Sequence, residues 1–158
     1  MMTDPSTDIS DGPRQGRQRT AALLARATFD ELNAAWQKIA EKPEVDPVRG
    51  PETGLVMVRG RIGGGGDPFN LGEATVTRAT VLLASGTAGH AHALGTDKAK
   101  VRMAAIFDAL WQEDQTRAFV EAEILGPIEV RIAQQDRQKA EETAATRVDF
   151  FTMVRGDD

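Results

Sequence analysis

The sequence of 158 residues contains no cysteine and no tyrosine, and aromatic residues make up only 5% of it. Without cysteine, the chain cannot form a disulfide, a thiolate metal site or the ligand set of an iron–sulfur cluster. Any redox or radical chemistry must therefore belong to another chain. The hydrophobic core must rely on Leu, Val, Ile, Met and Ala.

Long apolar runs are absent as well. No segment approaches the ~20 apolar residues of a membrane span. The opening stretch MMTDPSTDISDGPRQGRQR has no apolar stretch of the kind that a secretory signal carries. The lack of cysteine fits a reducing compartment. We therefore expect a soluble, cytoplasmic protein that is not exported.

The chain has no excess of positive charge. Its formal net charge is −5 and its pI is near 5.1. General binding to nucleic acid or to an anionic membrane needs a net positive field. The composition therefore argues against both kinds of partner, although local basic sites remain open.

The order of patterns along the chain predicts an α+β fold. Residues 1–13 are rich in Asp, Ser, Thr and Pro and are expected to be a disordered tail, whereas residues 14–158 form a single domain. Within this domain we expect a helical part over 14–41, a linker over 42–53, a sheet over 54–95, helices over 97–146 and an apolar C-terminal segment over 147–155.

Two helices carry clear signals. Thr28 followed by Glu31 forms a capping box that opens the amphipathic stretch TFDELNAAWQKIA. Residues 97–115 place their large apolar side chains on one stripe and should pack on the sheet. Gly126 before Pro127 suits an N-cap, so a further long and polar helix is expected to begin there and to extend from the body.

The middle of the chain is rich in glycine and β-formers. The runs TGLVMVRGRI and EATVTRATVLLASG, followed by TAGHAHALG, are typical of strands joined by short connections. Such connections favour an antiparallel meander of three to four strands with helices packed on one face. Pro43, Pro47 and Pro51 in the preceding segment predict a linker.

The glycine loop GRIGGGGDPFN resembles a phosphate cradle because glycine lets backbone N–H groups approach an anion closely. No Lys follows these glycines as a P-loop requires, and Pro68 or Phe69 stands where the dinucleotide fingerprint needs glycine. The element that follows is also a strand, not a helix. A flexible hairpin connection is the favoured interpretation.

His90 and His92 are the two histidines, and their spacing puts both on one face of a strand. Two imidazoles supply only two metal ligands, and the neighbouring sequence offers no third or fourth. We expect them to face solvent and predict no metal site.

Arg78 in EATVTRA lies on the strand face opposite Glu73, Thr75 and Thr77. A buried arginine would be a good phosphate ligand because its planar fork pairs with two oxygens. An exposed arginine on a sheet is the commoner case. No Ser-His-Asp or Cys-His arrangement is present, so no catalytic residue is predicted.

The C-terminal RVDFFTMVRGDD is too apolar for a tail left in water. As a strand it would alternate Val148 and Phe150 with Phe151 and Met153, leaving a phenylalanine on each face. We expect one face to lie on the home sheet and the other on a partner. The predicted interface residues are Val148, Phe150, Phe151, Met153 and Arg155.

The segments ETGLVMVRGRIGGGG, GEATVTRATV, GTDKAKVRMAAIFDALWQ and RVDFFTMVRGD together resemble the PhnG family, the smallest subunit of the bacterial carbon–phosphorus lyase core complex. The resemblance covers residues from about 17 to 157 in order. It implies a role in using phosphonates as a phosphorus source. It supplies no catalytic residue that can be carried onto a position of this chain.

The resemblance also implies partners. PhnG-like chains act with PhnH-, PhnI- and PhnL-like subunits to displace adenine from ATP with methylphosphonate, giving ribose 1-methylphosphonate 5-triphosphate. The PhnI-like subunit is the closest partner, and a PhnJ-like radical subunit later breaks the carbon–phosphorus bond. ATP would be a substrate of the complex, and this chain would bind no cofactor of its own.

Three hypotheses follow for the function. The first is a required supporting subunit of this transferase that is not itself catalytic. The second is a module that contacts phosphate or nucleotide through Arg78, Arg147 and the loop at residues 63–66. The third is a free-standing binding module unrelated to phosphonates.

Overall fold

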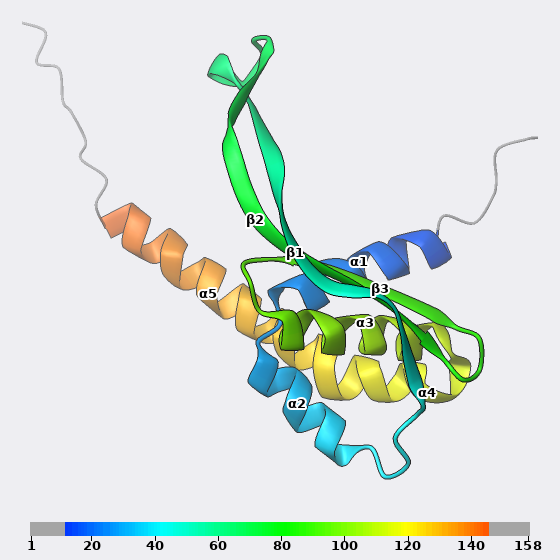
Figure 1. Cartoon of the computed structure of the whole chain (residues 1–158). Coiled ribbons are helices and arrows are strands. Elements are labelled where there is room, and N and C mark those ends of the chain that lie inside the picture. The colour runs from blue at the N-terminus through cyan, green and yellow to red at the C-terminus, as the bar shows by residue number, and fades with distance from the viewer. Residues whose placement is uncertain (1–11, 146–158) are drawn as a thin grey trace, which may run out of the picture.

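The computed structural model describes residues 12–145 and has the expected α+β fold (Figure 1). Its sheet contains three antiparallel strands in the order β1-β2-β3, formed by β1 Val45–Arg61, β2 Pro68–Leu83 and β3 Ala88–Leu94. Consecutive strands are neighbours, so the predicted meander is confirmed. The short 3-10 turn Ile62–Gly64 begins the connection between β1 and β2.

The predicted linker over residues 42–53 is wrong for most of its length, because β1 begins at Val45. β1 is an edge strand, where a missing proline N–H can face away from the ladder. The pairing with β2 is also shifted between Pro47 and Arg49 and between Arg49 and Glu52. These irregularities accommodate Pro47 and Pro51 without ending the strand.

Two helices precede the sheet, and the remaining helices follow it. They are α1 Gly12–Arg26, α2 Phe29–Lys38, α3 Lys98–Gln112, α4 Asp114–Val120 and α5 Gly126–Ala145. The predicted capping box of α2 is confirmed: Thr28 Oγ1 accepts from the Glu31 N–H at 3.2 Å, and the Thr28 N–H donates to Glu31 Oε2 at 2.8 Å. Asp97 caps α3 by accepting from the Lys100 N–H.

The predicted long helix is present as α5 from Gly126, but the prediction that Gly126 is its N-cap is wrong. Helix α4 runs through a π-helical turn, Glu121–Leu125, directly into α5, and Gly126 has helical dihedral angles. The Gly126 N–H bonds to the carbonyl of Glu121, five residues earlier. The widened turn fits the site of Pro127, which has no N–H to continue the ladder. Proline here marks a bulge within a helix, not its start.

The core lies between the sheet and the helices. On β2, Thr77, Ala79 and Val81 are buried, whereas Arg78 between them is exposed, so one face of this part of the sheet meets the helices. Phe107 of α3 is 0% exposed. The largest of its fully buried companions are Leu24, Leu32, Ile124, Leu125 and Ile128.

Gly89 of β3 sets how closely the sheet approaches α3. A Cβ atom at this position would lie 2.0 Å from the carbonyl oxygen of Ala105 and 2.8 Å from Cβ of Ala109. Alanines on the facing side of the helix complement the glycine, so backbone meets backbone here. This contact fixes β3 on the helical layer.

The last part of α5 leaves the body, as the thin apolar pattern predicted. Ile132 is its last buried residue, and residues 133–145 are exposed. Figure 1 shows the end of this helix extending from the rest of the molecule. No helix in the part of the chain that the structure describes is long and apolar enough to cross a membrane.

Candidate interaction site

The most distinctive feature of the molecule is a projecting two-stranded arm, defined here as residues 55–75. The pairing of β2 with β3 ends at Val76 opposite Leu94, but β1 and β2 continue to pair as far as Arg61 opposite Pro68. Figure 1 shows this ribbon standing clear of all the helices. No residue of the arm is buried. A two-stranded hairpin with nothing packed on it is marginally stable in water.

The β1 strand of the arm is apolar on both faces over residues 55–58. Along β1, Leu55 and Met57 point to one face and are 63% and 53% exposed, whereas Val56 and Val58 point to the other and are 47% and 39% exposed. A strand with one wet face alternates apolar and polar residues, and this segment does not. Its sequence is that of a strand covered on both sides.

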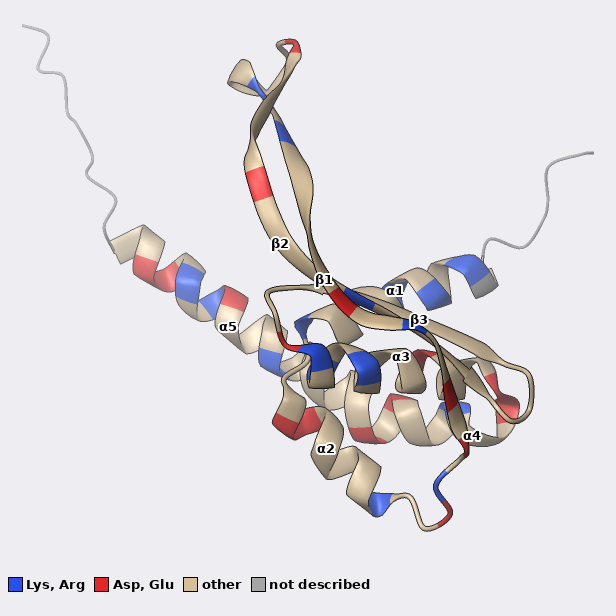
Figure 2. Ribbon diagram, in the orientation of Figure 1, with Lys and Arg blue, Asp and Glu red and all other residues tan. Residues whose placement is uncertain are grey.

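Exposed apolar side chains concentrate in the arm. Of the eleven large exposed hydrophobic residues in the described part of the chain, seven lie there, namely Leu55, Val56, Met57, Val58, Ile62, Phe69 and Leu71. Figure 2 shows long uncharged stretches along both strands of the arm, in contrast to the charged helices. A contiguous apolar surface of this kind marks an interaction site.

The tip of the arm is a glycine-rich turn. Gly63 and Gly64 have φ of 60° and 77°, a conformation that other residues rarely adopt. The Gly66 N–H bonds to the Ile62 carbonyl at 3.0 Å, and Arg61 Nη1 donates to the Gly66 carbonyl at 3.1 Å. The loop therefore connects two strands, as the hairpin interpretation of the sequence predicted.

Arg78 lies at the base of the arm and is exposed, with 58% of its side chain accessible. Its Nε donates to Glu52 Oε1 at 2.7 Å, and Arg49 Nε approaches the same oxygen at 3.3 Å. Beside this cluster, a shallow hollow of about 290 Å³ is lined mainly by residues 52–56 and 76 together with Arg78. Gly54 contributes no side chain to fill it.

The structure does not bring the proposed phosphate ligands together. Arg78 is ten positions along β2 from Pro68, which pairs at the tip, so about 30 Å of strand separates it from the glycine loop. A single phosphate group cannot contact both. Arg147 lies outside the described residues, as do Val148, Phe150, Phe151, Met153 and Arg155.

Both histidines are exposed on β3, as predicted. His90 Nδ1 lies 3.1 Å from Thr80 Oγ1, its partner across the strands. Within residues 12–145, no group of three or more His, Cys, Asp or Glu side chains is arranged to hold a metal ion.

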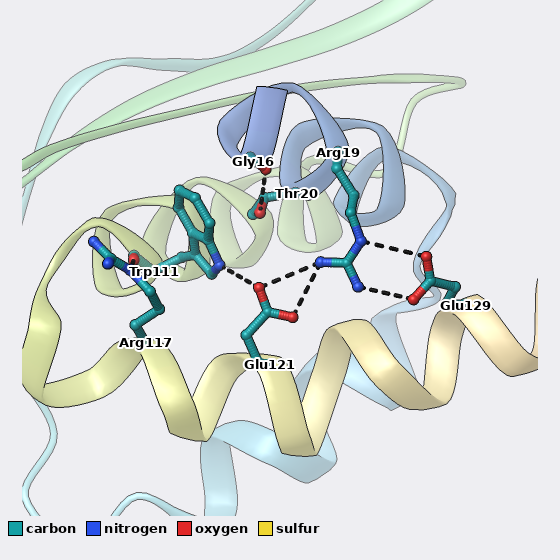
Figure 3. Close-up of polar contacts among 7 residues, drawn as sticks. All are labelled: Gly16, Arg19, Thr20, Trp111, Arg117, Glu121 and Glu129. Atoms are coloured by element: carbon teal, nitrogen blue, oxygen red, sulfur yellow. Dashed lines mark hydrogen bonds and ion pairs between the residues drawn. The ribbon is translucent and has the colours of Figure 1, made fainter. Parts of the chain in front are cut away.

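Polar contacts between residues far apart in the sequence hold the helices together. Arg19 of α1 bridges Glu121 and Glu129, with Nη1 and Nη2 at 3.0 and 2.8 Å from their carboxylates, and Trp111 Nε1 donates to Glu121 at 2.7 Å (Figure 3). Hydrogen bonds to Glu129 and then Glu121 raise the pKa of Arg19, and the bond from Arg19 lowers the pKa of Glu129. This network joins α1 to α3 and to the helix that contains the π turn.

Two further ion pairs fasten α1 to α3, through Arg17 and Asp108, and α2 to α5, through Glu31 and Arg131. Asp108 is 1% exposed and accepts from Arg17 Nη2 at 3.0 Å and from the His90 N–H at 2.8 Å. Burial opposes ionisation of Glu31, but hydrogen bonds from Arg131 and the Thr28 N–H outweigh it and hold the pKa of Glu31 below its usual range. The contacts of Asp108 with Arg17 and His90, and of Glu31 with Arg131, join residues between 18 and 100 positions apart, so no local pattern in the sequence predicts them.

The described residues therefore combine a rigid helical body with an uncovered apolar arm. Oδ2 of the buried Asp108 carboxylate is held by structural partners, and both histidines are exposed. This arrangement is suited to binding another protein chain, because the arm presents an extended and exposed apolar surface.

Comparison with known proteins finds a family model and a relative that match nearly the whole chain. A family model described as "Phosphonate metabolism protein PhnG" matches residues 15–156. A protein of Rhizobium meliloti (strain 1021), called alpha-D-ribose 1-methylphosphonate 5-triphosphate synthase subunit PhnG, is 62% identical over 157 residues. The match covers 99% of this chain and 100% of that protein.

Proposed function

The chain belongs to the PhnG family of phosphonate metabolism proteins, and we propose that it is a required, non-catalytic subunit of alpha-D-ribose 1-methylphosphonate 5-triphosphate synthase. In this reaction methylphosphonate displaces adenine from the ribose of ATP. A phosphonate oxygen bonds to C1 of the ribose, and the bond from C1 to the adenine nitrogen breaks. The triphosphate stays on the ribose.

The exposed arm is the observation that carries the supporting role. Its apolar side chains cluster on both faces of a ribbon that packs on no other part of the described chain. A protein that worked alone would keep this surface in water at a cost in solubility. Within an assembly, the same surface supplies the energy of association.

The partners we propose are a PhnI-like subunit as the closest neighbour, with PhnH-, PhnJ- and PhnL-like subunits in the same system. ATP is then a substrate of the complex, and this chain binds no cofactor of its own. The nucleosidase chemistry belongs to the PhnI-like partner. The cytoplasm, where ATP is available, is the proposed compartment.

Omitting this chain tests the proposal directly. We expect the partner subunits, mixed with ATP and methylphosphonate, to release adenine at less than about 1% of the rate of the full set, and adding this chain should restore the rate. The chain alone should release none. Adenine release is followed by chromatography. Full activity without the chain, or activity of the chain alone, would contradict the proposed role.

The phosphate-binding hypothesis makes a different prediction for Arg78. We expect Arg78→Ala to leave the KM for ATP of the assembled synthase within about twofold, because Glu52 already pairs with this arginine. Glu52→Gln, which frees the guanidinium, serves as the matched variant. If Arg78→Ala raised the KM at least tenfold and Glu52→Gln lowered it, Arg78 would be a phosphate ligand.

A further inference from the structure

Strand β1 differs along its length in how its outer edge is protected. The lower part of β1 contains Pro47 and Pro51 and has two register shifts, features that prevent another strand from pairing there. From Glu52 to Val58, by contrast, the pairing with Arg78 to Gly72 runs without a shift and the segment contains no proline. The outer edge of β1 is therefore open and regular from Glu52 to Val58.

The other edge of the arm is less suitable for pairing. On β2 it begins at Pro68, which cannot donate a hydrogen bond, and the register shifts opposite Val58 and Arg59, where Leu71 is the extra residue. A strand added on this side would meet both irregularities. The regular edge belongs to β1.

We propose that residues 54–58 of β1 accept an extended segment of a partner subunit as a fourth strand of the sheet, and that the same subunit encloses both faces of the arm. This inference rests on the proposed function, since it assigns the contact by which the chain joins the assembly. Main-chain hydrogen bonds along an open edge provide affinity, and side chains on alternate sides provide specificity.

The size of the arm favours enclosure over docking on one face. Eight residue pairs, from Gly54 opposite Val76 to Arg61 opposite Pro68, give a ribbon roughly 26 Å long and 10 Å wide. One face then offers roughly 260 Å², well below the ~800 Å² that each partner buries in a stable interface. The two faces and the outer edge of β1 together approach the area that each partner buries in a stable interface.

The charged residues of the arm indicate the chemistry of the partner segment that binds to it. In the part of the chain that the structure describes, Arg59 and Arg61 pair with no carboxylate, and both follow the apolar run directly. The complementary strand is apolar over about five residues and carries an acidic residue at the end nearest the tip.

Hydrogen–deuterium exchange resolved to single amides tests the added strand. In the free chain, the amides of residues 54–58 that point away from β2 should exchange quickly, and in the co-expressed synthase assembly they should slow at least about a hundredfold. An assembly that forms while these amides still exchange quickly would overturn the inference and leave the proposed function intact. Failure of the unaltered chain to assemble would instead sink the proposed function.

Two substitutions on opposite faces test the enclosure. We expect Leu55→Lys and Val56→Lys each to reduce recovery of the assembly at least tenfold, because a lysine on either face meets an apolar wall. Val130→Lys on α5, which changes a residue 59% exposed outside the arm, is the control and should have no effect. If only one of the two arm substitutions reduced recovery, enclosure would be wrong.

Hydrogen–deuterium exchange of the free chain distinguishes the other possible occupants of the β1 edge. Slow exchange of residues 54–58 in a free dimer would assign the edge to a second copy. Slow exchange in a free monomer that disappears when the chain ends at Ala145 would assign it to this chain's own C-terminal segment. Either result overturns the assignment to a partner subunit, and fast exchange in the free full chain supports it.

Discussion

Removing the arm should leave the stability of the fold nearly unchanged and weaken assembly with the partner subunits. In this variant, residues 55–75 are replaced by Asn-Gly, which joins Gly54 to its register partner Val76 through a two-residue hairpin turn. No residue of the deleted segment is buried, so we expect the free energy of unfolding to change by less than about 1 kcal/mol. Affinity for the partner subunits should fall at least about a hundredfold, since the main apolar contact is gone.

Urea unfolding of the free chain and affinity capture of the partner subunits measure the two effects separately. Val130→Lys provides the control for a change of exposed apolar surface elsewhere. Normal capture by a folded chain without its arm would place the interface on another surface. A chain that no longer unfolds cooperatively would show that the arm contributes to the fold, contrary to its exposure.

Gly89→Ala should destabilise the chain by about 3 kcal/mol or more. The added Cβ would lie 2.0 Å from the Ala105 carbonyl oxygen, so β3 must move away from α3. That movement would also disturb the bond from the His90 N–H to the buried carboxylate of Asp108. Urea unfolding of the free chain followed by circular dichroism measures the loss.

Gly54→Ala is the matched control, because it adds the same methyl group to a strand glycine. No atom lies within 4 Å of a Cβ at that position. We expect its free energy of unfolding to stay within about 0.5 kcal/mol of the unaltered chain. Equal effects of the two substitutions would mean that the close approach of β3 to α3 is wrong.

The sequence predicted those parts of the fold that depend on local chemistry. The capping box at Thr28 and Glu31 needs only four residues and was placed correctly. The order of strands followed from short connections, which favour pairing of neighbours. The exposure of His90, His92 and Arg78 followed from their alternation with residues that face the helices.

Features set by tertiary context were missed. Pro47 and Pro51 predicted a linker because the sequence does not show that their strand lies at the edge of the sheet. The pair Gly126 and Pro127 fits an N-cap and the first turn of a helix as well as it fits a π turn inside a helix. The contact of Gly89 with α3 depends on residues 16 and 20 positions away, so no local pattern indicates it.

The arm was open to prediction but was not recognised. The run LVMV within TGLVMVRGRI is apolar at every position, whereas a strand with one wet face alternates. The next strand carries the alternating pattern EATVTRA, which is typical of a strand with one wet face and does not indicate an arm. Only the register shows that β1 and β2 continue together beyond β3. The predicted C-terminal interface stays a prediction, since its residues lie outside the described part.

The native mass of the full chain, alone and co-expressed with its PhnH-, PhnI- and PhnJ-like neighbours, tests the central claim most directly. Light scattering on a sizing column should give one large complex that contains this chain when the neighbours are present. Without them, the apolar faces of the arm should make the chain self-associate as its concentration rises, with the edge at residues 54–58 left unpaired. A stable monomer that elutes apart from those neighbours would contradict the account.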